Sequence, residues 1–139
     1  MSDKVETRTF GMSRKDVAAL DDWLEEIGAR WSADKRMMFG ARLCVAELAA
    51  NAIEHGIAVS GDDHMIVTVR SVCRGIEVEF LDSRAPFDPT TWPEALRAEP
   101  PEPASPTGRG LYLIQRWAED LTYSHDGIHN RVGLTIKSD

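Results

Sequence analysis

The stretch "LCVAELAANAIEHG", Leu43 to Gly56, predicts a helix in which Glu47, Asn51 and His55 recur at every fourth position of an apolar run. The apolar residues that can face a core are Leu48, Ala49, Ala52 and Ile53. A carboxylate and an amide one turn apart can hold Mg²⁺ through the amide oxygen and leave the acid for general-base work. The alternative is a solvated helical face, which is common for such a pair taken alone.

Composition and charge narrow the class of protein. The chain has 139 residues, of which 42% are hydrophobic, and this favours one domain, residues 1–139, with one core. Its 16 basic and 23 acidic residues give a net charge of −7, which disfavours direct binding to nucleic acid or to an anionic membrane. No leader-like apolar segment and no run of about 18 apolar residues occurs, so we expect a soluble cytoplasmic protein. The two cysteines and four histidines show no metal-ligand spacing.

Two helices are predicted before the first hairpin. After a short edge strand at "VETRTFGM" (5–12), Ser13 can cap a helix whose apolar residues recur at three- and four-residue steps. Ser32 or Asp34 then begins a longer helix, which we expect to end near Gly56 with the glycine in a left-handed conformation.

From residue 64 the hydrophobic period changes to two, which predicts a hairpin that turns at Arg74 and Gly75. Its expected buried face consists of Met65, Val67, Val69, Ile76, Val78 and Phe80. A helix around "GLYLIQRWAED" (110–120) precedes a second hairpin that turns at "GIHN" (127–130). Grouped strands with helices between them predict an α+β two-layer sandwich, in which a mostly antiparallel mixed β-sheet carries its helices on one face.

A proline-rich segment lies between the two hairpins. All seven prolines fall between Pro86 and Pro106. A long irregular segment in so small a domain is typical of a functional lid or of a linker, and the chain that follows is too short to fold alone. We therefore predict a lid at about residues 88–109, with one short helix near "TWPEALRA" (91–98).

Two further groups of residues are candidates for a binding site. Asp82 ends a strand on the wet side of the buried alternation, where a carboxylate can accept a hydrogen bond from an exocyclic amine; the alternative is an Asx turn before Pro86. Gly108 and Gly110 flank Arg109 immediately before a helix, and the free N–H groups of a helix start can bind phosphate. The alternative for these glycines is a loop with unusual dihedral angles.

Three motifs in this order, "VAELAANAIEHG", "DSRAPFDP" and "GRGLYLIQ", resemble the bacterial anti-sigma-factor serine/threonine kinase family. The resemblance spans almost the whole chain and implies a histidine-kinase-like ATPase domain with the Bergerat (GHKL) fold. It also implies Glu47 as the catalytic base, Asn51 as the Mg²⁺ ligand and Asp82 as the acceptor for the adenine amino group. The other implied nucleotide contacts are Arg84, Gly108, Arg109, Gly110, Leu111 and Asn130. We expect His55 to pack or hydrogen-bond at the helix end instead of acting in catalysis.

Arg84 departs from the pattern of the family, because relatives have glycine two residues after the adenine-reading aspartate. A long cationic side chain there would strain a loop that needs positive φ, or would intrude on the pocket. Alternatively, it swings outward toward a partner or a phosphate.

The resemblance implies an ATP- and Mg²⁺-dependent kinase that phosphorylates a small anti-sigma-factor antagonist in a partner-switching system. A sigma factor is a further partner that the resemblance suggests, and relatives suggest a homodimer. Because no acceptor-histidine helix precedes the domain, we expect the acceptor to come from another protein. Two alternatives stay open: a non-catalytic module of the same fold that sequesters a regulator or sigma factor with weak or no nucleotide binding, and a simple ATPase.

Overall fold

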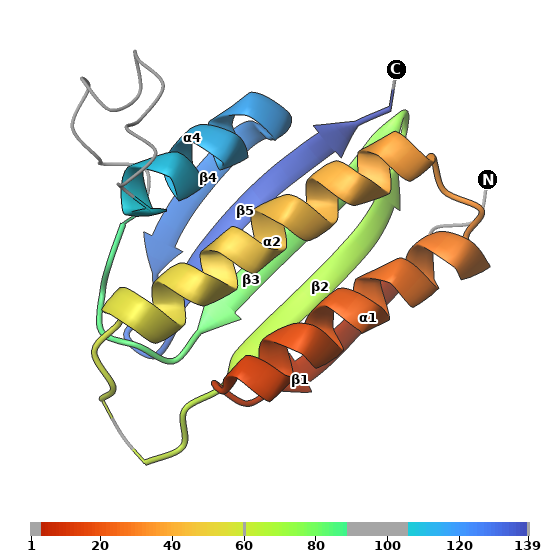
Figure 1. Ribbon diagram of the computed structural model, residues 1–139. Coiled ribbons are helices and arrows are strands. Elements are labelled where there is room, and N and C mark those ends of the chain that lie inside the picture. Colours follow the sequence, from red (N-terminus) through yellow and green to blue (C-terminus); the bar gives the residue numbers. More distant parts are fainter. Residues whose placement is uncertain (1–3, 60, 89–105, 139) are drawn as a thin grey trace.

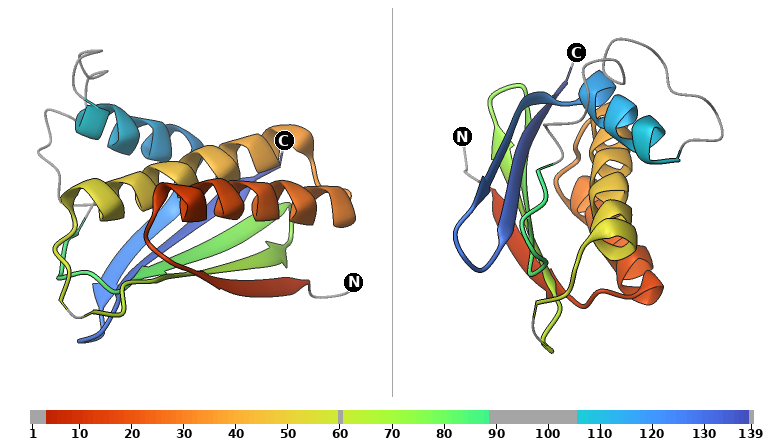
Figure 2. Two further views of the ribbon diagram at one scale, coloured as in Figure 1. Left: turned by 60° about the horizontal axis from the view of Figure 1, so that its bottom comes forward. Right: turned by 90° about the vertical axis from the view of Figure 1, so that its left-hand side faces the viewer.

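The computed structural model describes residues 4–59, 61–88 and 106–138, which form a sheet with helices on one face (Figure 1). The strands are β1 (Val5–Phe10), β2 (Met65–Val72), β3 (Gly75–Asp82), β4 (Glu119–His125) and β5 (Asn130–Lys137). The helices are α1 (Arg14–Arg30), α2 (Lys35–His55) and α4 (Pro106–Trp117). Seen along the layers, the sheet lies on one side and the helices on the other, which confirms the predicted α+β two-layer sandwich (Figure 2).

The sheet has five strands in the order β1-β2-β3-β5-β4, and each neighbouring pair is antiparallel. The sheet in the described part of the chain is therefore antiparallel throughout, and no parallel pair makes it mixed. Its register aligns one residue from each of four adjacent strands: Phe10 opposite Met65, Met65 opposite Asp82, and Asp82 opposite Asn130. This cross-strand row brings Asp82 and Asn130 side by side, although they lie far apart in the sequence.

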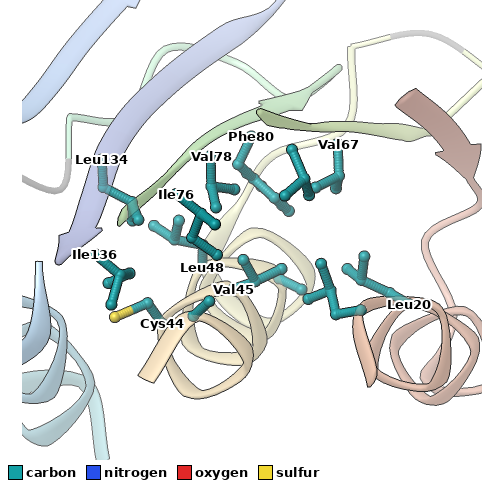
Figure 3. Packing of buried hydrophobic residues seen from close by; sticks show 14 of the residues in the cluster. Leu20, Cys44, Val45, Leu48, Val67, Ile76, Val78, Phe80, Leu134 and Ile136 are labelled. Carbon is teal, nitrogen blue, oxygen red and sulfur yellow. The ribbon is translucent and has the colours of Figure 1, made fainter. Parts of the chain in front are cut away.

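The core fills the space between the sheet and the helices (Figure 3). Alternate residues of β2, β3 and β5 face the helices and are buried, as the period of two predicted. Among the buried side chains that Figure 3 labels are Leu20, Val45, Leu48, Val67, Val78, Phe80 and Leu134. The opposite positions form the solvated face, where Arg70 pairs with Glu77 at 3.7 Å and Arg131 with Glu79 at 2.7 Å.

The first two helices begin at capping residues. The Ser13 side chain accepts from the Asp16 amide while Asp16 accepts from the Ser13 amide, which makes a capping box. Of the two residues predicted to begin α2, Asp34 is the cap: its carboxylate accepts from the Met37 amide at 2.7 Å. Among the described residues, neither of these helices nor α4 is both long and apolar enough to cross a membrane.

An ion pair joins α1 to α2. The Arg42 guanidinium donates Nε to Asp21 Oδ1 at 2.9 Å and Nη2 to Asp21 Oδ2 at 2.8 Å. These hydrogen bonds lower the pKa of the Asp21 carboxyl, an effect that partial burial opposes. The two-point contact fixes the orientation of the guanidinium and links α2 to α1 beside their apolar contact.

Two predicted turn details are wrong. Gly56 follows α2 with φ −71° and ψ 148°, so it is extended and not left-handed. Its lack of a side chain is used for close approach, since a Cβ there would meet the Ala52 carbonyl and lie 2.8 Å from Arg84 Cγ. The β2–β3 turn lies one residue earlier than the predicted Arg74 and Gly75: it consists of Cys73 and Arg74, and Gly75 is the first residue of β3.

The last helix begins earlier than predicted. We expected it after Gly110, but α4 starts at Pro106, and proline suits the first helical position because its missing N–H would have no helical partner. Gly108, Arg109 and Gly110 are therefore helical and do not form a loop before the helix. Of the predicted lid, residues 89–105, including the expected short helix at 91–98, lie outside the described residues.

A glycine on α2 lets α4 pack closely against it. A Cβ at Gly40 would overlap the six-membered ring of the Trp117 indole. The same indole contacts the Phe39 ring edge-to-face, with 5.7 Å between centroids, and Arg36 lies over it at 5.1 Å. The position of α4 over the sheet therefore depends on the absence of a side chain at residue 40.

Replacing Gly40 with alanine should destabilise the fold. The methyl group would push the Trp117 indole away, and overpacking of this kind costs about 1–3 kcal/mol, more than the roughly 1 kcal/mol that alanine gains in helix propensity. Chemical denaturation of Gly40→Ala should show a lower free energy of unfolding. Gly61→Ala is the matched control, because no atom lies within 4 Å of a Cβ there. Equal stability of the two variants would contradict the packing role of Gly40.

Candidate functional site

A small cavity lies where α2 ends, β3 ends and β5 begins. It is lined by Leu48, Asn51, Ala52, Gly56, Phe80, Asp82, Arg84, Phe87, Asn130 and Val132. Its volume is about 20 Å³, which is room for about one water molecule. Four of the predicted site residues therefore meet here, from three separate parts of the sequence: Asn51, Asp82, Arg84 and Asn130.

Asp82 faces the covered side of the sheet, and the prediction that it lies on the wet side is wrong. It continues the alternation of Val78 and Phe80, so its side chain points toward the helices, and the residue is only 7% exposed. Its Oδ1 accepts from the Arg84 backbone N–H at 3.0 Å and from Asn130 Nδ2 at 2.9 Å. A buried carboxylate on the wall of a cavity is a suitable acceptor for an amine donor.

Asn130 holds the segment after β3 in place. Its Nδ2 faces three acceptors, namely Asp82 Oδ1 at 2.9 Å and the carbonyl oxygens of Arg84 and Ala85 at 3.2 and 2.9 Å. Its Oδ1 accepts from the Phe87 amide at 3.0 Å and from the Tyr123 hydroxyl at 2.6 Å. The partners on each side define the orientation of the amide group. This side chain, only 2% exposed as a residue, therefore links β5 to residues 82–87.

Tyr123 supports Asn130 from the edge strand β4. Burial raises the pKa of its hydroxyl, the hydrogen bond with the Phe87 backbone opposes this, and the nearby charges of Asp88 and Asp82 raise it further. The hydroxyl therefore stays protonated at neutral pH and donates to Asn130 Oδ1.

The three polar residues on the stripe of α2 do not all line the cavity. Asn51 is buried, at 8% exposure, and lines the cavity. Glu47 lies one turn earlier, half-buried and outside the cavity lining. Its charge adds to burial in raising the pKa of the Cys44 thiol to about 12. His55 is exposed at the helix end, with Nε2 3.8 Å from a Glu54 carboxylate oxygen, which places it away from the cavity lining.

Arg84 turns inward, which agrees with one of its two predicted positions and excludes the outward swing in this structure. Its side chain is 13% exposed; Nη1 donates to the Gly56 carbonyl at 2.8 Å, and Nη2 lies 3.2 Å from Asp63 Oδ2. Positive φ occurs at three described residues other than glycine, Ser32, Arg74 and Asp120, and Arg84 is not among them. The predicted backbone strain is therefore absent, whereas the predicted intrusion on the pocket occurs.

The other predicted phosphate contacts lie on α4. Gly108, Arg109, Gly110 and Leu111 occupy its first half, and their side chains lie outside the described part of the structure. The helix itself packs beside α2, along the side of the core opposite α1 (Figure 1).

The chemistry of the cavity fits a nucleotide with Mg²⁺, but its size does not. In the described residues, no three or more His, Cys, Asp or Glu side chains gather as a metal site. Mg²⁺ suits such a site, since it keeps several waters and needs few protein ligands, and the Asn51 amide offers a hard oxygen. Asp82 offers an acceptor for an amine. A cavity of about 20 Å³ is, however, too small for a purine, and Arg84 occupies the adjoining space.

A known protein family matches nearly the whole chain. The profile of the family described as "Histidine kinase-like ATPase domain" matches residues 12–136. The chain belongs to this family. The matched segment begins before α1 and ends within β5, so it contains Asn51, Asp82, Arg84 and Asn130.

Two known proteins resemble this histidine kinase-like ATPase domain over nearly its whole length. The serine/threonine-protein kinase BtrW of Bordetella bronchiseptica is 29% identical over 140 residues, covering 99% of this chain and 97% of that protein. The crystal structure of the RsbU and RsbW domains of Rv1364c from Mycobacterium tuberculosis superposes with a TM-score of 0.65 at 14% identity. That match covers 96% of this chain and 32% of the other, and it supports the fold.

Sequence reasoning missed two residues that contact the lining of the cavity, Tyr123 beside Asn130 and Asp63 beside Arg84. Tyr123 could have been found, because it lies on the half-buried alternation of β4 and its hydroxyl requires a partner. Asp63 carries no such signal, since it lies in the irregular segment before β2 and meets Arg84 only through the fold.

Replacing Asn130 with aspartate should make stability depend on pH. At pH 7 the new carboxylate would lie beside Asp82 and would lack the amide donors, which should cost about 3–5 kcal/mol. Repulsion from Asp82 raises the pKa of the introduced carboxyl in the folded state, so protonation favours folding and part of the loss is recovered as pH falls from 7 to 5. Thermal denaturation relative to wild type should show a larger recovery for Asn130→Asp than for Asn130→Ala, which removes the same donor from Asp82 without adding a charge. The same pH dependence in both variants would contradict the Asp82 contact.

Proposed function

We propose that this chain is an ATP- and Mg²⁺-dependent serine/threonine protein kinase of the anti-sigma-factor type. The observation that carries the proposal is the end-to-end match to a protein named a serine/threonine-protein kinase, 99% of one chain against 97% of the other. Membership of the histidine kinase-like ATPase domain family supports ATP as the nucleotide. The oxygen donors and the buried carboxylate around the cavity are compatible with it.

Three residues would have separate roles. Asn51 would hold Mg²⁺ through its amide oxygen, and Asp82 would accept a hydrogen bond from the adenine amino group. Bound Mg²⁺ would offset negative charge between the phosphates. Glu47, one helical turn from Asn51, would accept the proton of the acceptor hydroxyl.

The remaining contacts follow from the resemblance. The backbone and side chains of Gly108, Arg109, Gly110 and Leu111 would border the triphosphate, and Asn130 would lie near the base. The acceptor would be a serine of a small anti-sigma-factor antagonist, and a sigma factor would be a second partner in a partner-switching system. We also propose a cytoplasmic homodimer, as the relatives suggest.

Replacing Glu47 with glutamine should abolish phosphoryl transfer and spare nucleotide binding. The amide keeps the shape of the side chain but cannot accept the proton, and losing a general base typically costs about 10²–10⁴-fold in rate. The measurement is transfer of labelled phosphate from ATP to a small antagonist protein that carries an acceptor serine. Glu54→Gln, on the exposed end of the same helix, is the matched control and should keep the wild-type rate. Transfer retained by Glu47→Gln would remove Glu47 from this role.

A non-catalytic binding module is the second candidate, and the inward position of Arg84 favours it. Calorimetry with ATP and Mg²⁺ separates the two functions. A kinase should bind nucleotide at millimolar concentration or below, whereas the module should give no heat of binding while it still captures its protein partner. ATP hydrolysis with no transfer to any protein would indicate a simple ATPase.

A further inference from the structure

The Arg84 side chain is attached at two points on the rim of the cavity. Nη1 donates to the Gly56 carbonyl at 2.8 Å, and Nη2 pairs with Asp63 Oδ2 at 3.2 Å. The stem packs against the Gly56 backbone, where a Cβ would lie 2.8 Å from Arg84 Cγ. The guanidinium group therefore links the end of β3 to the α2–β2 connection across the cavity.

The backbone at Arg84 is held independently of its side chain. Its N–H donates to Asp82 Oδ1 at 3.0 Å, its carbonyl accepts from Asn130 Nδ2, and it forms an antiparallel bridge with Ala58. The Ala85 amide also donates to the Ile57 carbonyl at 2.8 Å. The side chain can therefore leave the cavity by rotation about its own bonds, without any change in these backbone contacts.

The inward position of the side chain is only weakly stabilised. Arg84 Nε is buried and has no hydrogen-bond partner in the described part of the chain, so one donor is unsatisfied while the side chain points inward. Its ionic partner, Asp63, is 27% exposed, so water can solvate that carboxylate when the ion pair opens. An outward rotation would return Nε to solvent at the loss of one hydrogen bond and one partly exposed ion pair.

We propose that Arg84 is a latch that sets the affinity for nucleotide: its attachment to Gly56 and Asp63 closes the base end of the cavity and must open before a purine can reach Asp82. This inference rests on the proposed ATP-binding function. With the latch closed, the cavity holds about 20 Å³, whereas pockets for ligands of this size are about 300–1,000 Å³. The closed latch and the bound base exclude each other, so the apparent dissociation constant equals the intrinsic one divided by the open fraction.

Truncating either side of the latch should strengthen ATP binding. We expect Arg84→Ala to lower the dissociation constant for ATP with Mg²⁺ by at least about fivefold, because the open fraction approaches one. Asp63→Ala removes the ion pair without altering the arginine and should give a smaller gain in the same direction. In the Arg84→Ala background, Asp63→Ala should add nothing, because both changes open the same latch. The measurement is isothermal titration calorimetry, with thermal denaturation of each variant to establish that it is folded.

Arg70→Ala is the matched control. It removes the same charge from an exposed arginine paired with Glu77 on the solvated face of the sheet, and it should leave the affinity unchanged. Binding by Arg84→Ala where wild type gives no heat would also support the latch.

Two results would overturn the proposed role of Arg84 without overturning the proposed nucleotide binding. One is unchanged or weaker binding by Arg84→Ala when wild type binds, since Arg84 would then be a neutral or favourable contact to the nucleotide. The other is an Asp63→Ala effect that persists in the Arg84→Ala background. If no variant binds at millimolar ATP, the proposed nucleotide-binding function fails together with the latch.

Discussion

The alternation of side chains along β3 and β5 is the constraint on which the rest of the site depends. The same period of two that buries Phe80 and Val132 also turns Asp82 and Asn130 toward the helices. Two polar side chains on a covered face need partners, because an unsatisfied buried polar group costs roughly 1–3 kcal/mol. They hydrogen-bond to each other, and Asn130 makes further hydrogen bonds to the backbone that follows β3. The end of the core is thus built as a polar wall.

This wall becomes a site only because α2 presents Asn51 to it. The rotation and depth of α2 are set at its other end and along its length, by the Asp34 cap, the Arg42–Asp21 pair and the approach of Trp117 over Gly40. None of these contacts touches the cavity. They act through the continuous backbone of α2, which runs from Lys35 to His55. Residues outside the cavity therefore help to hold the helix that carries Asn51.

The sequence was sufficient for features that depend on local pattern. Alternation predicted the hairpins and the buried face of β3, and capping chemistry identified Ser13. Two of the three ordered motifs contain Asn51, Asp82 and Arg84, which line the cavity. Features that depend on contacts between distant segments could not be predicted. Gly56 was expected to be left-handed, but it is extended and packs under Arg84, a partner 28 residues away. The orientation of Asp82 was within reach, because counting from Val78 and Phe80 places it on the covered face. The start of α4 could also have been predicted, if Pro106 had been taken as the first residue of a helix instead of as part of a loop.

Arg84 shows why a departure from a family pattern needs a structure to interpret it. A glycine two residues after the aspartate could serve the backbone, by allowing positive φ, or could serve the ligand, by leaving room. Because the backbone of this chain has no positive φ at Arg84, the first reason does not apply here. The arginine is therefore accommodated without strain, and what it changes is the space beside Asp82. Steric occupation by a flexible side chain is reversible, whereas backbone strain would be built into each folded molecule. Under the proposed latch, the difference from the family pattern at this position would therefore shift an equilibrium between two side-chain positions and leave the fold unchanged.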